Sequence, residues 1–119
     1  MFKKILSACL LFLLIISSSL ISEAKTWDKT FPKSDKVKVQ KAEFTNKYGI
    51  TLAGDLYIPK SADGRLPAIA VSGPFGAVKE QASGLYAQTL AERGFITLAF
   101  DPSYTGESSG TPRNIASSD

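Results

Sequence analysis

The 119-residue chain contains no histidine and only one cysteine, Cys9. A Ser-His-Asp triad, a haem site and a histidine- or cysteine-ligated zinc site all require side chains that are missing here. A single cysteine also excludes an intrachain disulfide. The chain therefore cannot complete any of these centres by itself, and we expect it to hold neither a metal ion nor a cofactor.

The net charge of the chain is also small. The formal net charge is +3, and removing residues 1–24, which include Lys3, Lys4 and Glu23, lowers it to +2. A nucleic-acid-binding domain normally carries a concentrated basic excess, so no nucleic-acid partner is expected. The lysines between residues 25 and 47 are interpreted as a solvated face, with a basic partner-binding patch as the alternative.

What the chain does have, at its start, is the pattern of a secretory signal peptide. Lys3 and Lys4 precede an unbroken apolar run from Leu10 to Ile16, and Ser22-Glu23-Ala24 places small residues at positions −3 and −1 of a cleavage site. The run is short for a membrane span of about 20 residues, and an uncleaved anchor is the alternative. We therefore predict a signal peptide over residues 1–24 and an exported protein, periplasmic or extracellular, with no stable membrane span after cleavage.

Residues 25–119 are enough for one small domain and contain no internal repeat. The polar segment 25–35 is predicted to be a flexible lead-in, although Trp27 and Phe31 could dock on the body of the domain.

Period-two alternation predicts two strands, Val37–Thr45 and Ile50–Ile58. Between them lies the turn signal Asn46-Lys47-Tyr48-Gly49. The two strands are therefore expected to form an antiparallel hairpin.

Two short apolar runs follow the hairpin, Ala68–Val71 and Phe95–Phe100. Continuous apolar runs favour strands that are covered on both faces, as in parallel sheets. Between the runs, apolar periodicity predicts a helix whose sheet-facing stripe consists of Ala82, Leu85, Tyr86, Thr89, Leu90 and Arg93. Two buried strands joined by one helix form a βαβ unit with parallel strands, so the predicted fold class is α/β.

The predicted helix also has recognisable ends. Glu80 is expected in the first turn and Arg93 in the last, where their charges suit the helix dipole. Gly94 stands where a left-handed C-terminal cap is favoured. Gly84 inside the helix indicates close packing on the sheet, because glycine otherwise weakens a helix.

The turn after the first apolar run is a candidate binding site. In Ser72-Gly73-Pro74-Phe75-Gly76-Ala77, Gly73 and Gly76 allow the backbone to come close to a bound group. Pro74 has no N–H, so the donors would come from Phe75, Gly76 or a neighbour. Such donors could stabilise an oxyanion, or bind a phosphate at the helix N-terminus; a plain tight turn is the third interpretation.

The loop after the second run begins at Asp101, at the carboxyl end of a strand, where open parallel sheets bind ligands. Asp101 could be a base, a ligand or an acceptor that organises the loop, and the last role is commonest. Gly106 and Ser108 are assigned to the same loop-organising group. Ser103 and Ser108 have no visible base partner, so neither is a catalytic candidate.

These residues resemble a known family. The stretch GPFGAVKEQASGLYAQTLAERGFITLAFDPSYTGESSGTPRN is similar to the N-terminal half of α/β-hydrolases, in particular the bacterial dienelactone-hydrolase-like and acyl-peptidase-like group. The hairpin ending in Leu56-Tyr57-Ile58-Pro59 resembles the same group's opening strands, so the resemblance covers about residues 36–116. The loop from Asp101 looks like the family's D-x-x-G-x-G-x-S loop, with the earlier glycine replaced around Tyr104. Ser72 stands where the family's oxyanion turn commonly has a histidine.

The resemblance implies an incomplete α/β-hydrolase fold: an antiparallel hairpin plus one βαβ unit, preceded by the signal peptide. Residues 36–119 would be the N-terminal portion of the domain, truncated before the G-x-S-x-G nucleophile elbow. The implied strand order is 1-2-4-3-5. The third strand's outer edge would then be bare, so the isolated chain is expected to be unstable or to need a complementing C-terminal segment.

The resemblance also implies a function. Intact relatives would hydrolyse ester or acyl bonds of small molecules through a nucleophile-His-acid triad, with a Ser or Cys nucleophile and an oxyanion donor near Phe75. No catalytic residue of that triad matches a position here, so the chain alone is expected to be inert. The alternatives are a small exported α/β module that binds phosphate or another ligand, and a structural or interaction protein.

Overall fold

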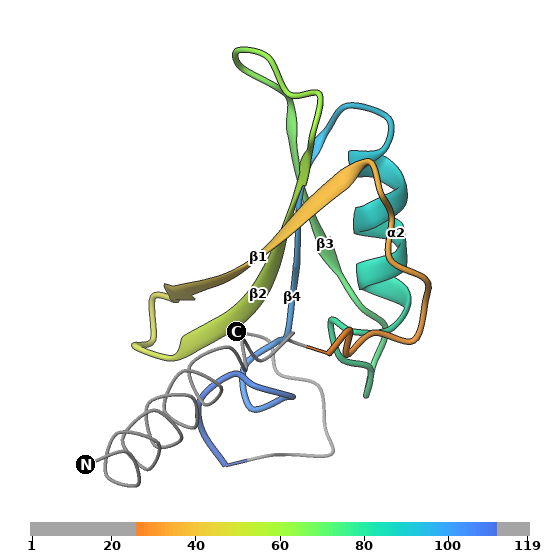
Figure 1. The fold of residues 1–119 in the computed structure, drawn as a ribbon. Helices are drawn as coiled ribbons and strands as arrows, with labels where there is room; N and C mark the ends of the chain where they lie inside the picture. The colour runs from red at the N-terminus through yellow and green to blue at the C-terminus, as the bar shows by residue number, and fades with distance from the viewer. Residues whose placement is uncertain (1–25, 112–119) are drawn as a thin grey trace, which may run out of the picture.

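The computed structural model describes residues 26–111, and the predicted signal peptide lies outside this range. The chain forms four strands and one helix in this part, in the order β1 (Val37–Thr45), β2 (Thr51–Pro59), β3 (Ala68–Ser72), α2 (Ala82–Ala91) and β4 (Ile96–Phe100) (Figure 1). Among the described residues, no helix has the length and apolar character that crossing a membrane requires.

The hairpin forms as the alternation predicts. β1 and β2 pair antiparallel over their whole lengths, from Val37 opposite Pro59 to Thr45 opposite Thr51. Asn46 closes the turn, because its side-chain oxygen accepts hydrogen bonds from the backbone N–H groups of Tyr48 and Ile50 at 2.9 and 3.0 Å. Gly49 provides the positive φ of 78° that this turn needs.

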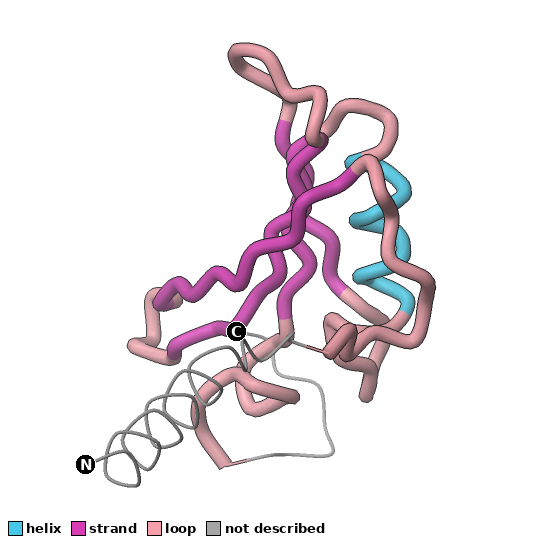
Figure 2. The backbone as a smooth tube through the Cα atoms, in the orientation of Figure 1, coloured by secondary structure: helices cyan, strands magenta, loops and turns pink. Residues whose placement is uncertain are grey.

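The four strands form one mixed sheet in the order β1-β2-β4-β3 (Figure 2). β4 runs antiparallel to β2 and parallel to β3, which confirms the predicted parallel pair and the order of these four strands. Within the described residues β3 is covered on one face only, although its continuous apolar run is typical of a strand covered on both. Ala68, Ala70 and Ser72 are exposed, whereas Ile69 and Val71 on the other face are half-buried.

Helix α2 packs on the sheet through small side chains. Its buried residues are Ser83, Gly84, Ala87, Gln88 and Ala91. The predicted stripe is wrong, since Leu85 and Tyr86 are 45% and 67% exposed. At Gly84 an added Cβ would lie 2.3 Å from the carbonyl oxygen of Lys79 and 2.9 Å from the Tyr57 hydroxyl, so a larger residue would push the helix away.

The ends of α2 also differ from the prediction. The helix runs from Ala82 to Ala91, so Glu80 precedes its first turn and Arg93 follows its last. Gly94 has a φ of 97°, and its N–H donates to the carbonyl of Ala91 at 3.0 Å, which fits the predicted glycine stop.

The segment 26–35 runs beside α2 (Figure 1) and completes the core. Of the two arrangements considered for it, the structure has the docked one. Phe31 is buried in a cluster with Val37, Tyr57, Ala87, Ala91 and Ala99, and Trp27 packs against that cluster. The side chain of Gln88 fixes the segment from the helix, because its amide donates to the carbonyl of Pro32 at 2.9 Å and its oxygen accepts from the N–H of Ser34 at 3.1 Å.

Candidate functional site

The turn after β3 presents backbone donors that are not used inside the described chain. The N–H of Ala77 donates to the carbonyl of Pro74 at 3.1 Å, which closes a tight turn around Phe75 and Gly76. Gly76 has a φ of 75°, and the Phe75 side chain is 69% exposed. The N–H groups of Phe75 and Gly76 have no hydrogen-bond acceptor within residues 26–111. Two neighbouring donors at a strand end are therefore available to an anionic oxygen.

Asp101 holds the segment that follows this turn. Its carboxylate is fully buried and accepts from the backbone N–H of Lys79 at 2.7 Å through one oxygen. The second oxygen accepts from the Lys79 ammonium at 2.9 Å and from the N–H of Glu107 at 3.0 Å. The carboxylate thus ties the segment that follows β3 to the loop that follows β4, which are the contacts of an organising acceptor.

Gly106 and Ser108 complete this loop. A Cβ at Gly106, where φ is 54°, would lie 2.3 Å from an oxygen of Asp101, so the loop can close on the carboxylate only with glycine at that position. The Ser108 hydroxyl donates to the carbonyl of Asp101 at 2.8 Å and accepts from the N–H of Ala53 at 3.0 Å. Both of its hydrogen-bonding roles are therefore structural.

Gly73 and Ser103 occupy less central places. A Cβ at Gly73 would lie 3.4 Å from the hydroxyl of Ser83, which is an ordinary contact, so packing against α2 does not by itself require glycine there. The Ser103 hydroxyl accepts from the side-chain amide of Asn46 at 3.2 Å, which joins the loop to the hairpin turn. Tyr104 stands where the family loop has a glycine, and its φ of 65° is positive.

A network of charged side chains surrounds Asp101. The ammonium of Lys79, whose side chain is fully buried, lies 2.9 Å from Asp101, 2.6 Å from Glu80 and 2.6 Å from Glu107. Lys41 on β1 contacts Glu107 at 3.0 Å from the opposite side. The network therefore connects the loop after β4 to the hairpin as well as to the segment after β3.

The network continues through β2. The Asp55 carboxylate, which is buried, lies 2.7 Å from the Lys29 ammonium and 3.2 Å from that of Lys41. Asp28 lies 2.9 Å from Lys29. The interpretation of the lysines of residues 25–47 as a solvated face fits Lys33, Lys36, Lys38 and Lys47, which are exposed. It is wrong for Lys29, whose side chain is almost fully buried and pairs with two carboxylates.

These contacts fix the charge states. Hydrogen bonds from Lys79 and Lys41 lower the pKa of Glu107 to about 2. Burial by itself would lower the pKa of Lys79, but its hydrogen bonds to Asp101, Glu107 and Glu80 outweigh burial, so the pKa is raised. The pKa of Lys41 is raised too, since Glu107 and Asp55 outweigh its partial burial. Glu107, Lys79 and Lys41 are thus charged at neutral pH, which makes them poor members of a proton relay.

Sequence reasoning did not identify Lys79, Lys41 or Asp55. The pair of Lys41 and Asp55 can be predicted from the sequence, because counting back from the turn at Asn46 places these two residues opposite each other in the hairpin. Lys79 carried no such signal, since its partner Asp101 lies 22 residues away and beyond a helix. Among the described residues, no group of three or more His, Cys, Asp or Glu side chains is placed to hold a metal ion.

Comparison with known proteins gives hydrolase neighbours. No family model matches the chain. The chain is 73% identical over 94 residues to the uncharacterized protein PA2218 of Pseudomonas aeruginosa, covering 78% of this chain and 25% of that protein. The crystal structure of PA2218 superposes with a TM-score of 0.74 at 72% identity, over 78% of this chain and 29% of that one.

Two fungal proteins that are similar to the chain are named as hydrolases. The α/β hydrolase GrgF from Penicillium sp. sh18 matches with a TM-score of 0.57 at 35% identity, over 65% of this chain and 26% of that one. A thiohydrolase of Eupenicillium brefeldianum is 35% identical over 75 residues, which are 63% of this chain and 23% of that protein. The chain thus spans about a quarter of the length of these relatives, and over that part its partial α/β fold is similar to that of α/β hydrolases.

Proposed function

We propose that this chain forms the oxyanion side of an exported α/β hydrolase that cleaves ester or related acyl bonds of a small molecule. The finer assignment, also proposed, is to the bacterial dienelactone-hydrolase-like and acyl-peptidase-like group. The proposal is carried by one observation: the N–H groups of Phe75 and Gly76 have no acceptor among the described residues and lie at the carboxyl end of β3.

In this role the chain would stabilise charge, not transfer protons. When a nucleophile attacks an acyl carbon, the carbonyl oxygen becomes negative, and preorganised N–H donors stabilise it. Asp101 and Lys79 would keep the turn in place, because they fix the segment that follows it to the loop after β4. The sequence has no histidine to act as the base, so at least the base of such a triad would come from outside these residues.

Phosphate binding is the weaker interpretation of the same turn. It needs the turn to open directly into a helix, whose first N–H groups then face the anion. Here α2 begins at Ala82, and residues 77–81 separate it from Gly76. The N–H of Val78 donates to the side chain of Gln81, and the N–H of Lys79 donates to Asp101, so two donors of the intervening segment are already used.

A chimaera tests the oxyanion role. Residues of this chain would replace the aligned 94-residue segment of the P. aeruginosa relative, and hydrolysis of p-nitrophenyl esters and a thioester would be measured. Phe75→Pro removes the N–H donor, whereas Phe75→Ala keeps it and removes only the exposed ring. We expect Phe75→Pro to lower kcat by about 10²–10³-fold, and Phe75→Ala to change it by only a few-fold.

Comparing the two variants of Phe75 shows whether its N–H or its side chain matters for hydrolysis. Equal losses in Phe75→Pro and Phe75→Ala would show that the side chain, and not the N–H, matters. An active chimaera in which neither variant has an effect would place the oxyanion donors elsewhere. Saturable binding of inorganic phosphate that protects the turn, in a chimaera without acyl hydrolysis, would favour the phosphate-binding interpretation.

Two simpler observations test the remaining parts of the proposal. Reading frames downstream of Asp119 are expected to encode G-x-S-x-G or G-x-C-x-G followed by Asp and His, and their absence in every frame would contradict a hydrolase origin. Export is tested by N-terminal sequencing of protein recovered from the periplasm or medium. The sequence is expected to begin at Lys25, and protein retained in the cytoplasm would contradict export.

A further inference from the structure

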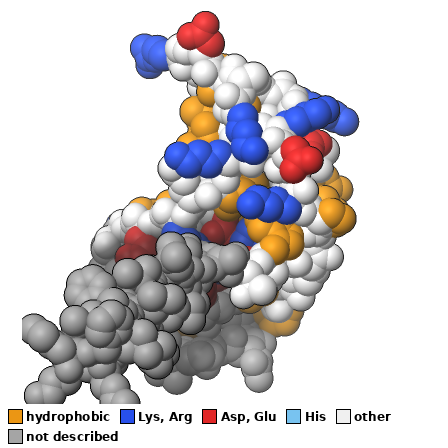
Figure 3. Space-filling view, in the orientation of Figure 1, with side chains coloured by type: hydrophobic (Ala, Val, Ile, Leu, Met, Phe, Trp, Pro, Cys, Tyr) orange, Lys and Arg blue, Asp and Glu red, His pale blue; other side chains and the backbone are white. Residues whose placement is uncertain are grey.

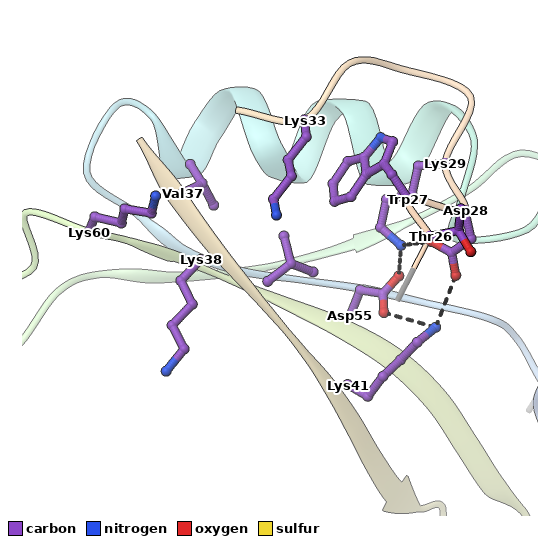
Figure 4. A pocket seen from close by; sticks show the side chains of 11 residues that line it. Thr26, Trp27, Asp28, Lys29, Lys33, Val37, Lys38, Lys41, Asp55 and Lys60 are labelled. Atoms are coloured by element: carbon purple, nitrogen blue, oxygen red, sulfur yellow. Dashed lines mark hydrogen bonds and ion pairs between the residues drawn. The ribbon is translucent and has the colours of Figure 1, made fainter. Parts of the chain in front are cut away.

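A groove of about 300 Å³ lies between the segment 26–35 and strand β1, away from the turn after β3 (Figure 4). Its accessible apolar lining consists of Trp27 and Val39, since Val37, which also borders the groove, is only 1% exposed. The remaining lining is mostly basic, with five lysines and two aspartates. A concave apolar surface with a few charged groups at its rim is the usual form of a small-molecule site, and this volume lies at the lower end of that class.

The indole of Trp27 is held in place at the groove. Its Nε1–H donates to the carbonyl of Phe31, and its ring meets the Phe31 ring edge to face with centroids 5.8 Å apart. Phe31 itself is buried in the core. The apolar wall is therefore rigid before any ligand arrives, which lowers the entropic cost of binding.

The lysines of the groove fall into two groups. Lys29 and Lys41 are paired with Asp28 and Asp55, as the dashed contacts in Figure 4 show. The other three, Lys33, Lys38 and Lys60, form no ion pair within the described part of the chain; Lys33 lies only over the Trp27 ring, 5.9 Å from its centroid. Lys38 alternates with Val37 and Val39 along β1, so its side chain points to the other face of the strand (Figure 4). The two aspartates are thus occupied, and the charges of Lys33 and Lys60 remain in the groove without a partner.

Figure 3 shows, on one face of the molecule, several basic side chains with few acidic side chains among them. A groove with unpaired cations attracts anions, and its low-dielectric walls strengthen the attraction.

We propose that this groove binds an organic carboxylate, whose apolar body lies against Trp27 and Val39 and whose carboxylate faces Lys33 and Lys60. The apolar wall argues against a bare inorganic anion, which would leave it unfilled. The small volume argues against a polymer. The inference is independent of the hydrolase proposal, because none of these residues belongs to the turn after β3 or to the loop after β4.

Trp27 makes the test direct, because it is the only tryptophan in the chain. The purified 119-residue chain would be titrated with octanoate while the Trp27 fluorescence is recorded, and octanol and inorganic phosphate would serve as comparison probes. We expect a saturable change with octanoate, and binding at least about 10-fold weaker for either comparison probe, since each satisfies only half of the site.

Two charge-matched variants assign the effect. Lys33→Gln/Lys60→Gln removes the two unpaired groove charges and leaves the buried network intact. Lys47→Gln/Arg65→Gln removes two exposed positive charges elsewhere. The groove variant is expected to bind octanoate about 10-fold more weakly, and the control variant to bind within about two-fold of the unmodified chain. Circular dichroism checks that both variants are folded.

Each other outcome would overturn the proposal. No saturable change with octanoate rules out the site. Octanol binding as tightly as octanoate shows a purely apolar groove, and phosphate binding as tightly shows a simple anion site. Equal losses in the two double variants show that overall charge, and not the groove, attracts the ligand. If the groove variant alone is unfolded, the single variant Lys60→Gln at the rim replaces it, with Lys47→Gln as its control.

Discussion

Replacing Lys79 by methionine removes the charge at the centre of the site while keeping most of the volume of the side chain. The Lys79 ammonium is surrounded by the carboxylates of Asp101, Glu80 and Glu107, at 2.6–2.9 Å. Lys79→Met leaves the backbone N–H bond to Asp101 in place. The substitution therefore isolates the contribution of the ammonium from that of the turn.

The expected cost follows from burial. The side chains of Lys79 and Asp101 are both fully buried. Breaking such a pair on one side costs about 3–5 kcal/mol, because the other charge is left in a low dielectric. Two backbone N–H donors still contact Asp101, so we expect the lower end, about 3 kcal/mol. That is a large part of the roughly 5–15 kcal/mol that stabilises a typical domain.

Urea unfolding of the purified chain, followed by Trp27 fluorescence, measures this cost. With a slope of about 1–1.5 kcal/mol/M for a chain of this size, the midpoint should fall by about 2–3 M. Lys36→Met is the matched control, because Lys36 is exposed and forms no ion pair in the described part of the chain, and its effect should stay within about 0.5 kcal/mol. The double variant with Asp101→Asn should be less damaging than the sum of the two single variants.

Two results would refute the reasoning. A loss below about 1 kcal/mol in Lys79→Met would mean that water or other groups replace the ammonium at no cost. Strict additivity with Asp101→Asn would mean that the two side chains contribute independently, whatever their separation. The unmodified chain is measured first, because these comparisons require cooperative and reversible unfolding. If it unfolds in this way as a monomer, the instability expected from the sequence is wrong. If it does not, the same variants are compared in the chimaera with the P. aeruginosa relative.

Three further predictions concern the loop and the helix. Gly106→Ala should cost about 2–3 kcal/mol, because its Cβ would meet Asp101 at 2.3 Å, whereas Gly64→Ala, with a similar positive φ but open space, should cost only about 1 kcal/mol in the same unfolding assay. Glu107→Gln should lower stability by about 1 kcal/mol at neutral pH, a value discounted for the exposure of this side chain. Because the folded pKa of Glu107 is about 2, below its ordinary value of 4.5, this difference should be complete above about pH 4.5 and vanish as the pH falls toward 2. Leu85→Gln should change stability by less than about 0.5 kcal/mol, since Leu85 is exposed on α2.

Each of these has a result that contradicts it. Equal costs for Gly106→Ala and Gly64→Ala would show that the loss of stability comes from the backbone conformation alone, and not from a contact with Asp101. A pH-independent difference for Glu107→Gln would show that its carboxylate contributes nothing through charge. A loss of several kcal/mol in Leu85→Gln would show that Leu85 lies on the sheet-facing side of the helix, as periodicity predicts.

The hairpin and the parallel pair could be predicted because their signals are local. Alternation along Val37–Thr45 and the turn at Asn46 fix which residues face each other, so the pairing of Lys41 with Asp55 also follows from the sequence. The position of Asp101 at a strand end could also be predicted, because the apolar run directly before it is a local signal. The helix face was not, because periodicity ranks side chains by hydrophobicity and cannot tell how close the helix lies to the sheet.

By itself, the sequence determined the order of the elements, the glycines that turns require and the candidate donors at Phe75 and Gly76. The tertiary structure decided which charges meet. Lys79 reaches Asp101 across 22 residues and Lys41 reaches Glu107 across 66, so their contacts depend on how the strands, helix and loops come together. The lysine groove has the same origin, because the docking of Phe31 brings Trp27 and Lys33 against β1. Burial then makes such contacts strong, and burial is a property of the whole fold.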